Sequence, residues 1–124
     1  MIAADSSSLS AFFKGEKGTD IQLLTTAFNA GDICLPPIVL TELMSDPASV
    51  QAMTETVAGF ALLPILEGYW QRAGEIRRRL HQKGLKAKTA DALIAQACID
   101  HDVALITRDT DFRRFAKHCG LKLA

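Results

Sequence analysis

The residues best suited to chemistry are four carboxylates spread along the chain: Asp5, Glu42, Asp91 and Asp109. Asp5 directly follows a short apolar run, and Asp109 comes shortly after another. Because ligands of open α/β sheets bind beyond the carboxyl ends of the strands, both acids are expected on the ligand side. Asp91 lies in the first turn of a predicted helix, and Glu42 lies on a short helix after a Pro-Pro pair. The sequence therefore predicts that the four acids converge at one rim of a sheet.

Converging carboxylates repel one another unless a cation lies among them. Oxygen ligands of this kind suit Mg²⁺ or Mn²⁺, which can activate a bound water toward a phosphodiester. Taken singly, each acid also has an ordinary explanation as a turn, cap or solvated helix residue. The four positions together favour a site.

Charge is balanced over the 124 residues, with a formal net charge of zero, so a nucleic-acid partner must be held by a local basic patch. Between Arg72 and Lys88 the chain has seven Lys and Arg residues and only one acid, Glu75. A solvated helix face explains any one of them. Near the predicted site, the candidates for binding a nucleic-acid backbone are Lys86, Lys88 and Arg108.

Cysteine usage and hydropathy bear on the compartment. Cys34, Cys98 and Cys119 are odd in number and far apart, which argues against a disulfide framework and a zinc knuckle. No stretch reaches the length of a membrane span. We expect no membrane association and a cytoplasmic location.

Short apolar runs alternate with longer helical patterns, which predicts an α/β domain with a central, mainly parallel sheet of four to five strands flanked by helices. The pattern favours one domain over residues 1–124. The strands are expected at residues 1–4, 33–35, 60–65, 103–106 and 121–123. The helices are expected at residues 6–13, 19–30, 38–44, 67–82 and 111–118, with one ending near Val57 and one capped by Thr89.

Three details of these elements can be tested. Pro64 places the strand at 60–65 at a sheet edge. The helix over 67–82 should bury one face, formed by Tyr69, Ala73, Ile76 and Leu80. In the helix after Thr89, Asp91 lies one residue off the apolar stripe and is expected to face outward.

Four segments carry a family resemblance: Ala4-Asp5-Ser6-Ser7, Pro37 to Leu43, Ala90 to Ala95, and Leu105 to Phe112. With them the chain resembles PIN-domain ribonucleases, and most closely the VapC toxins of VapBC toxin–antitoxin pairs. The last two segments, separated by a helix and a strand, are the specific ones. The family usually has Thr after the first Asp, and Ser6 keeps a hydroxyl at this position.

The resemblance implies an endoribonuclease whose acidic quartet is Asp5, Glu42, Asp91 and Asp109, with Mg²⁺ or Mn²⁺ as cofactor. Of these, the metal ligands would be Asp5, Asp91 and Asp109. Ser7 and Thr107 would offer hydroxyls nearby. Asp111 would either touch the metal shell or cap the last helix.

The resemblance also implies three partners: an RNA substrate, a VapB-like antitoxin and a second copy of the chain. The antitoxin would lay a segment in a groove and block the acidic site. Apolar candidates for that groove are Phe12, Phe13, Leu40, Leu43 and Met44, although core packing is the default for such residues.

Three other classes compete with the nuclease. A receiver domain would need an acidic pair after the first strand, whereas Asp5 stands alone. A haloacid-dehalogenase-like phosphatase would need Asp-x-Asp there, and this motif occurs only at Asp109-Thr110-Asp111. The third is a catalytically silent PIN-like binding module, against which the presence of all four acids argues.

Overall fold

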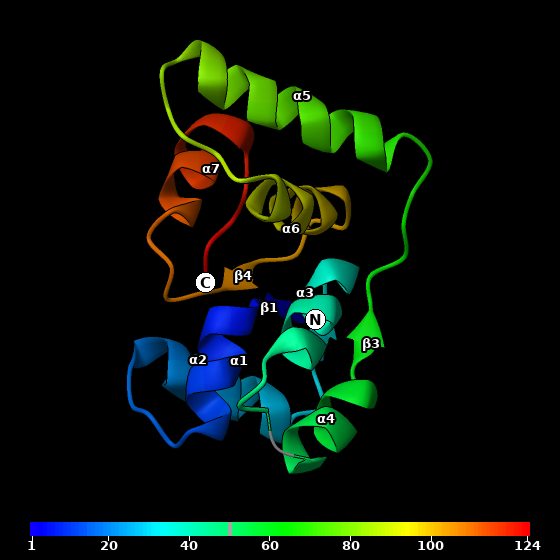
Figure 1. Ribbon diagram of the computed structural model, residues 1–124, viewed down its shortest axis with the longest axis vertical. Coiled ribbons are helices and arrows are strands. Elements are labelled where there is room, and N and C mark those ends of the chain that lie inside the picture. Colours follow the sequence, from blue (N-terminus) through cyan, green and yellow to red (C-terminus); the bar gives the residue numbers. More distant parts are fainter. Residues whose placement is uncertain (50) are drawn as a thin grey trace.

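The computed structural model describes residues 1–49 and 51–124 (Figure 1). Along the described chain, strands and helices alternate in the order β1 (Ile2–Ala4), α1 (Ser6–Phe13), α2 (Thr19–Asn29), β2 (Ile33–Leu35), α3 (Pro37–Ser45), α4 (Gln51–Ala58), β3 (Ala61–Leu62), α5 (Tyr69–Gln82), α6 (Thr89–Asp100), β4 (Leu105–Ile106) and α7 (Phe112–Cys119).

The strands form one four-stranded parallel sheet in the order β3-β2-β1-β4. This confirms the predicted α/β class and places β3 at the expected edge. The predicted strand at 121–123 is wrong: it makes only an isolated bridge between Leu105 and Leu123. Its partner β4 is two residues long, so little ladder is left for a fifth strand to extend.

The connections create a switch point between β1 and β4. The chain passes from β1 to β2 to β3 in one direction and then crosses back to place β4 on the other side of β1. In Figure 1, α1 to α4 lie on one side of β1 and β4, and α5 to α7 lie on the other. Ligand sites of doubly wound sheets form at such a reversal, beyond the carboxyl ends of the two strands.

Helix α6 is the central helix of its layer. It packs against α5, and most of its residues from Asp91 to Cys98 are buried. The predicted core face of α5 is confirmed, since Tyr69, Ala73, Ile76 and Leu80 are all buried. The predicted N-cap of α6 is off by one residue. Lys88 has the extended backbone of the cap and its carbonyl accepts from the N–H of Ala92, so Thr89 is already helical.

Two observations relate to the expected compartment. Cys34, Cys98 and Cys119 are all free and buried. Among the described residues, no helix is both long and apolar enough to cross a bilayer.

Candidate metal centre

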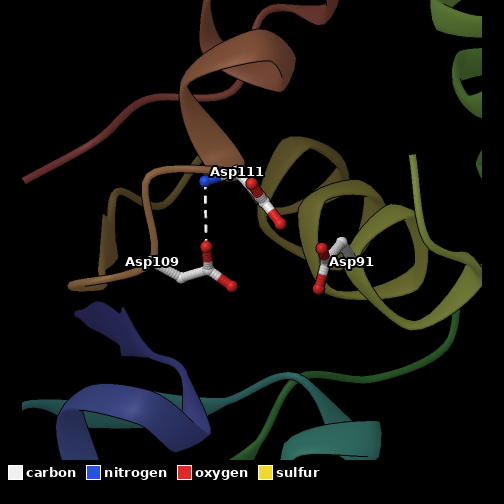
Figure 2. A group of neighbouring side chains, drawn as sticks. All are labelled: Asp91, Asp109 and Asp111. Atoms are coloured by element: carbon white, nitrogen blue, oxygen red, sulfur yellow. Dashed lines mark hydrogen bonds between the residues drawn. The ribbon is translucent and has the colours of Figure 1, made fainter. Parts of the chain in front are cut away.

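Three carboxylates meet beyond the end of β4: Asp91, Asp109 and Asp111. One oxygen from each lies within 4.8 Å of the others. Figure 2 shows Asp91 pointing from the first turn of α6 toward the loop between β4 and α7, where the other two stand. Asp111, for which the sequence left two roles open, therefore joins Asp91 and Asp109. We call these three residues the aspartate trio.

The turn after β4 is braced by its own polar groups. Asp109 Oδ1 accepts a hydrogen bond of 2.9 Å from the N–H of Asp111, and the N–H of Asp109 donates to Thr107 Oγ1 at 3.0 Å. Asp111 occupies the N-cap position of α7 but its side chain makes no capping hydrogen bond. Its carboxylate is thus directed to the trio and to an ion pair of 3.8 Å with Arg114.

Asp91 is buried, with only 8 % of its surface exposed. The expectation that it faces outward is wrong, because α6 is covered by neighbours beyond its apolar stripe and has little outward face. Burial raises the pKa of Asp91 to about 6, and the charges of Asp109, Asp111 and Glu42 add to the rise while Lys88 opposes it. A raised pKa of this size marks crowded negative charge in a partly dry pocket.

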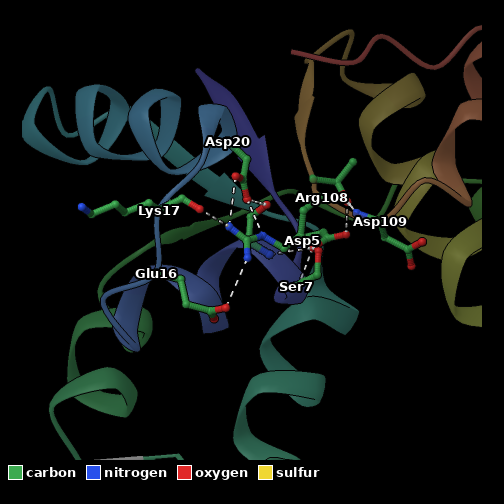
Figure 3. A network of polar contacts seen from close by, with 9 residues as sticks. Asp5, Ser7, Glu16, Lys17, Asp20, Arg108 and Asp109 are labelled. Carbon is green, nitrogen blue, oxygen red and sulfur yellow. Dashed lines mark hydrogen bonds and ion pairs between the residues drawn. The ribbon is translucent and has the colours of Figure 1, made fainter.

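Asp5 is held beside the trio by hydrogen bonds. It is 2 % exposed and is the N-cap of α1. Its Oδ1 accepts from the N–H and Oγ of Ser7, both at 2.6 Å, and from the N–H of Ser8. Thr107 Oγ1 donates to Oδ2 at 2.5 Å. The predicted hydroxyls of Ser7 and Thr107 thus both orient Asp5 (Figure 3), and its role as a direct metal ligand stays a prediction.

Glu42 is the fourth predicted acid and lies on α3. It is half-buried, and Ser6 Oγ donates to its Oε1 at 3.2 Å. Burial raises the pKa of Glu42, and the charge of Asp5 adds to the rise. Because Glu42 acts electrostatically on Asp91 and Asp5 acts on Glu42, the four predicted acids and Asp111 share one region of negative potential.

A cleft of about 400 Å³ opens beside the trio. Its wall includes Asp91 and Asp111 together with five basic or titratable side chains, which are Arg77, His81, Lys86, Lys88 and Arg114. The structure therefore places the predicted Lys86 and Lys88 next to the acids. Their contact with RNA stays a prediction.

Two arginines in the cleft wall support the loop that carries these lysines. Arg77 Nε donates to the carbonyl of Ala87 at 2.7 Å, and Arg114 donates to the carbonyl of Lys86. The sequence showed both only as members of basic runs. A hydrogen bond from a side chain to a backbone carbonyl ten or more residues away leaves no recognisable pattern in the sequence.

Arg108 lies away from this cleft. Its guanidinium pairs with Asp20 and Glu16 in the region between α1 and α2 (Figure 3). Asp20 was not singled out from the sequence, because an acid in the first turn of a helix is ordinary there. A second cleft of about 400 Å³ is lined by Arg108, Asp109 and Arg113, so Asp109 lies between the two clefts.

The apolar groove candidates divide between core and surface. Leu43 is buried and Met44 is exposed, whereas Phe12, Phe13 and Leu40 are half-buried against the core. Leu43 is therefore a core residue and not a groove residue. The other four keep apolar surface available.

In a comparison with protein families, a family model described as PIN domain matches residues 2–118. No curated protein sequence matches.

Solved structures with a similar fold come from VapBC toxin–antitoxin systems. VapBC-5 from Mycobacterium tuberculosis aligns with a TM-score of 0.71 and 19 % identity over 98 % of this chain and 95 % of that chain. VapBC2 from Rickettsia felis, bound to a DNA fragment from its promoter, gives 0.72 and 21 % over 100 % and 98 %. DNA-bound VapBC from Salmonella typhimurium gives 0.66 and 19 % over 100 % and 98 %. At these identities the likeness is one of fold.

Proposed function

This chain belongs to the PIN-domain family, and we propose that it is a metal-dependent endoribonuclease that serves as the toxin of a VapBC-type toxin–antitoxin pair. One observation carries the proposal. Asp91 from α6 and two aspartates of the β4–α7 turn meet at the switch point, beside a cleft lined with basic side chains, and Glu42 on α3 adds to their negative charge. Metal-dependent cleavage of an anionic polymer needs both features: an acidic centre that binds the metal ion, and basic side chains that attract the polymer backbone.

The donor set fits a hard divalent cation. The aspartate trio offers only carboxylate oxygens, and no Cys or His stands in it. Mg²⁺ and Mn²⁺ prefer such ligands. Burial first and neighbouring carboxylates second raise the pKa of Asp91, and a bound cation would offset both effects by stabilising the charged form. We propose that Asp91, Asp109 and Asp111 hold the ion, with Asp5 alongside.

A divalent ion in this position would supply an activated water and offset the charge that develops on the phosphodiester. The chain's own residues supply orientation and proton transfer. Ser7 and Thr107 fix the Asp5 carboxylate, and the Asp109–Asp111 turn fixes two members of the trio. Glu42 stands outside the trio with its Oε1 bound by Ser6. We propose that its other oxygen accepts the proton of the attacking water.

We propose that the substrate is RNA, guided by Lys86 and Lys88. These two side chains stand on the wall of the cleft that also includes Asp91 and Asp111. A phosphate held there would bring its neighbour in the strand to the acids. Because the net charge of the chain is zero, this local patch must supply the electrostatic attraction.

The proposed partners are a VapB-like antitoxin and a second copy of the chain. The three solved relatives are VapBC structures, which supports the first of these. On α3, half-buried Leu40 and exposed Met44 are four residues apart and share one face of the helix, and we propose that a segment of the antitoxin packs on this face. A toxin of this kind would act in the cytoplasm, where free cysteines stay reduced.

The experiment that tests the enzymatic proposal is cleavage of labelled RNAs in Mg²⁺, Mn²⁺ or EDTA. It compares the parent with Asp91→Asn and Asp109→Asn. We expect metal-dependent cleavage by the parent and none by either variant. Cleavage that survives EDTA and both substitutions would refute the proposal. Binding of RNA with no cleavage at any metal concentration would favour the silent PIN-like module.

The partner proposal has a separate test. A purified parent chain would be titrated with a candidate VapB-like antitoxin, and cleavage and mass would be followed together. We expect inhibition in a stable complex. Met44→Glu should weaken that complex while leaving cleavage by the free chain intact. If Met44→Glu binds the partner as tightly as the parent does, the surface on α3 is not the docking site.

A further inference from the structure

Arg108 is held by several acceptors from one region of the chain. Its Nε donates to Asp20 Oδ2 at 2.8 Å, and its Nη2 donates to Asp20 Oδ1 at 3.1 Å and to the carbonyl of Lys17 at 3.2 Å. Its Nη1 lies 3.6 Å from Glu16 Oε1. A planar guanidinium that binds both oxygens of one carboxylate is fixed in direction as well as in position. Figure 3 shows this network reaching from the start of α2 to the end of β4.

Asp20 is itself anchored to the core. Its Oδ2 also accepts from Ser8 Oγ at 2.8 Å, and Ser8 is fully buried in α1. The hydrogen bonds from Arg108 and Ser8 lower the pKa of Asp20 against the opposing effect of burial. Gly18 allows the close approach. A Cβ built on it would stand 2.5 Å from Asp20 Oδ1, and its φ of +153° disfavours other residues.

The pair stands between groups that order the acidic pocket. The residue before Arg108 is Thr107, which donates to Asp5. The residue after it is Asp109, which belongs to the aspartate trio and braces Asp111. A displacement of Arg108 would therefore move Thr107 and Asp109 with it, because the three are consecutive in the backbone.

We propose that the Arg108–Asp20 pair is a clamp that sets the position of the β4–α7 turn, and with it the spacing of the acids that take the divalent ion. In this role Arg108 and Asp20 are positioning residues. The proposal rests on the proposed metal-dependent function of the same pocket. It replaces the expectation that Arg108 contacts RNA, because Nε and Nη2 already donate to Asp20 and Lys17 and Nη1 lies 3.6 Å from the carboxylate of Glu16.

The chain contains a matched control. Arg72 pairs with Asp100 through Nε at 3.0 Å and Nη2 at 2.6 Å, and Gln96 donates to the same carboxylate. The two aspartate side chains are similarly covered, at 12 % exposed for Asp20 and 8 % for Asp100. In each pair, an aspartate carboxylate with little exposed surface accepts two hydrogen bonds from one guanidinium and a third from a neutral side chain. Only the Asp20 pair is connected to the acidic pocket.

The test compares Asp20→Ala with Asp100→Ala in three measurements. These are urea unfolding in EDTA, Mn²⁺ binding by calorimetry, and the kcat and KM of RNA cleavage. Both variants should lose stability. Asp20→Ala should also bind Mn²⁺ about tenfold more weakly, as residues that orient metal ligands do, and should lower kcat with KM for RNA nearly unchanged. Asp100→Ala should keep the parent's Mn²⁺ affinity and kcat.

Arg108 variants separate the clamp from an RNA contact. As a clamp, Arg108→Gln should resemble Asp20→Ala, the double variant should be no worse than either, and Arg108→Lys should recover only part of the loss because it cannot bind both oxygens. As an RNA contact, Arg108→Gln would raise KM while Asp20→Ala left it unchanged or lowered it.

The possible results are distinguishable. If Asp20→Ala keeps the parent's Mn²⁺ affinity and kcat, or if Asp100→Ala loses as much, the clamp is refuted while the nuclease stands. If the parent neither binds Mn²⁺ nor cleaves RNA, the proposed function fails first, and the clamp has no site to serve.

Discussion

Replacing Asp91 by Asn should stabilise the metal-free protein while it abolishes activity. Asp91 is buried among other acids, and its pKa is raised to about 6. The native state must therefore hold a charge that its surroundings disfavour. Asparagine keeps nearly the same shape and removes that charge. A cluster of acids that can bind a cation therefore destabilises the folded protein when no cation is bound.

The size of the expected gain in stability follows from the pKa shift of Asp91. A rise in pKa from 3.8 to about 6 corresponds to roughly 3 kcal/mol of penalty on the charged form. Part of this penalty is retained in the variant, because the Asn amide must also lose water in the same pocket. We expect a gain of about 1 to 2 kcal/mol in the free energy of unfolding at pH 7.5.

The stability difference between Asp91→Asn and the parent should depend on pH in a definite direction. The folded protein holds the Asp91 proton more tightly than the unfolded chain does, where the carboxyl titrates near 3.9. The contribution of this group to stability is therefore complete below about pH 4 and is lost as the pH rises through about 6. The advantage of Asp91→Asn over the parent should be small near pH 4.5, grow up to about pH 6.5 and then stay constant.

The assay is urea unfolding in EDTA at a series of pH values, with Asp5→Asn as the contrasting variant. Asp5 accepts hydrogen bonds from Ser7, Ser8 and Thr107 as the N-cap of α1. Asparagine can still cap α1 through its one oxygen, but it places an amide NH2 group where Oδ2 accepts from Thr107, so this replacement should lower stability by about 1 kcal/mol. The same chemical change should thus have opposite signs at two acids of one pocket. A parent that is more stable than Asp91→Asn at pH 7.5, or a difference that does not vary with pH, would refute this reasoning.

Three further predictions concern the cleft, the core and the clamp. Lys86→Gln and Lys88→Gln should each weaken RNA binding in EDTA and reduce the slope of log affinity against log salt by about 0.7; an unchanged slope would remove that lysine from the RNA path. Tyr69→Phe removes the hydroxyl that donates to an α6 carbonyl at 2.6 Å, and it should lower the free energy of unfolding in urea by about 1 kcal/mol. An unchanged free energy of unfolding would show that this hydrogen bond does not stabilise the fold. Gly18→Ala should destabilise the fold by at least about 1 kcal/mol and weaken Mn²⁺ binding, because its Cβ would collide with Asp20; a variant as stable as the parent would show that the loop has room.

Local signals in the sequence were sufficient for the elements that hold the acids. The start of α1 at Ser6 and the strand at Ile33–Leu35 agree with expectation, because each apolar run is short and is followed at once by an N-cap residue or a proline. The end of the chain shows the opposite case. Leu121 to Leu123 has the composition of a strand, but a strand also needs a partner of sufficient length, and β4 does not offer one.

The site was predictable in its chemistry and less so in its geometry. Residue type and strand ends indicated where acids gather, and all of them lie in one acidic region. The burial of Asp91 could not be read from its helix, since it depends on how α6 is covered by its neighbours. Nor could the pairing of Arg108 with Asp20, because 88 residues separate them and each looks ordinary beside its own neighbours.

The difference between Asp5 and Asp111 shows why motif position alone does not assign ligands. Both occupy the N-cap position of a helix that follows a strand, yet the oxygens of Asp5 accept from Ser7, Ser8 and Thr107, whereas Asp111 makes no capping hydrogen bond and belongs to the trio. A carboxylate that already accepts several hydrogen bonds is rigid, and one with few is free to approach a cation. The acidic region therefore combines a rigid acid with an available one, and the rigid Asp5 ties the end of β1 to Thr107 at the end of β4.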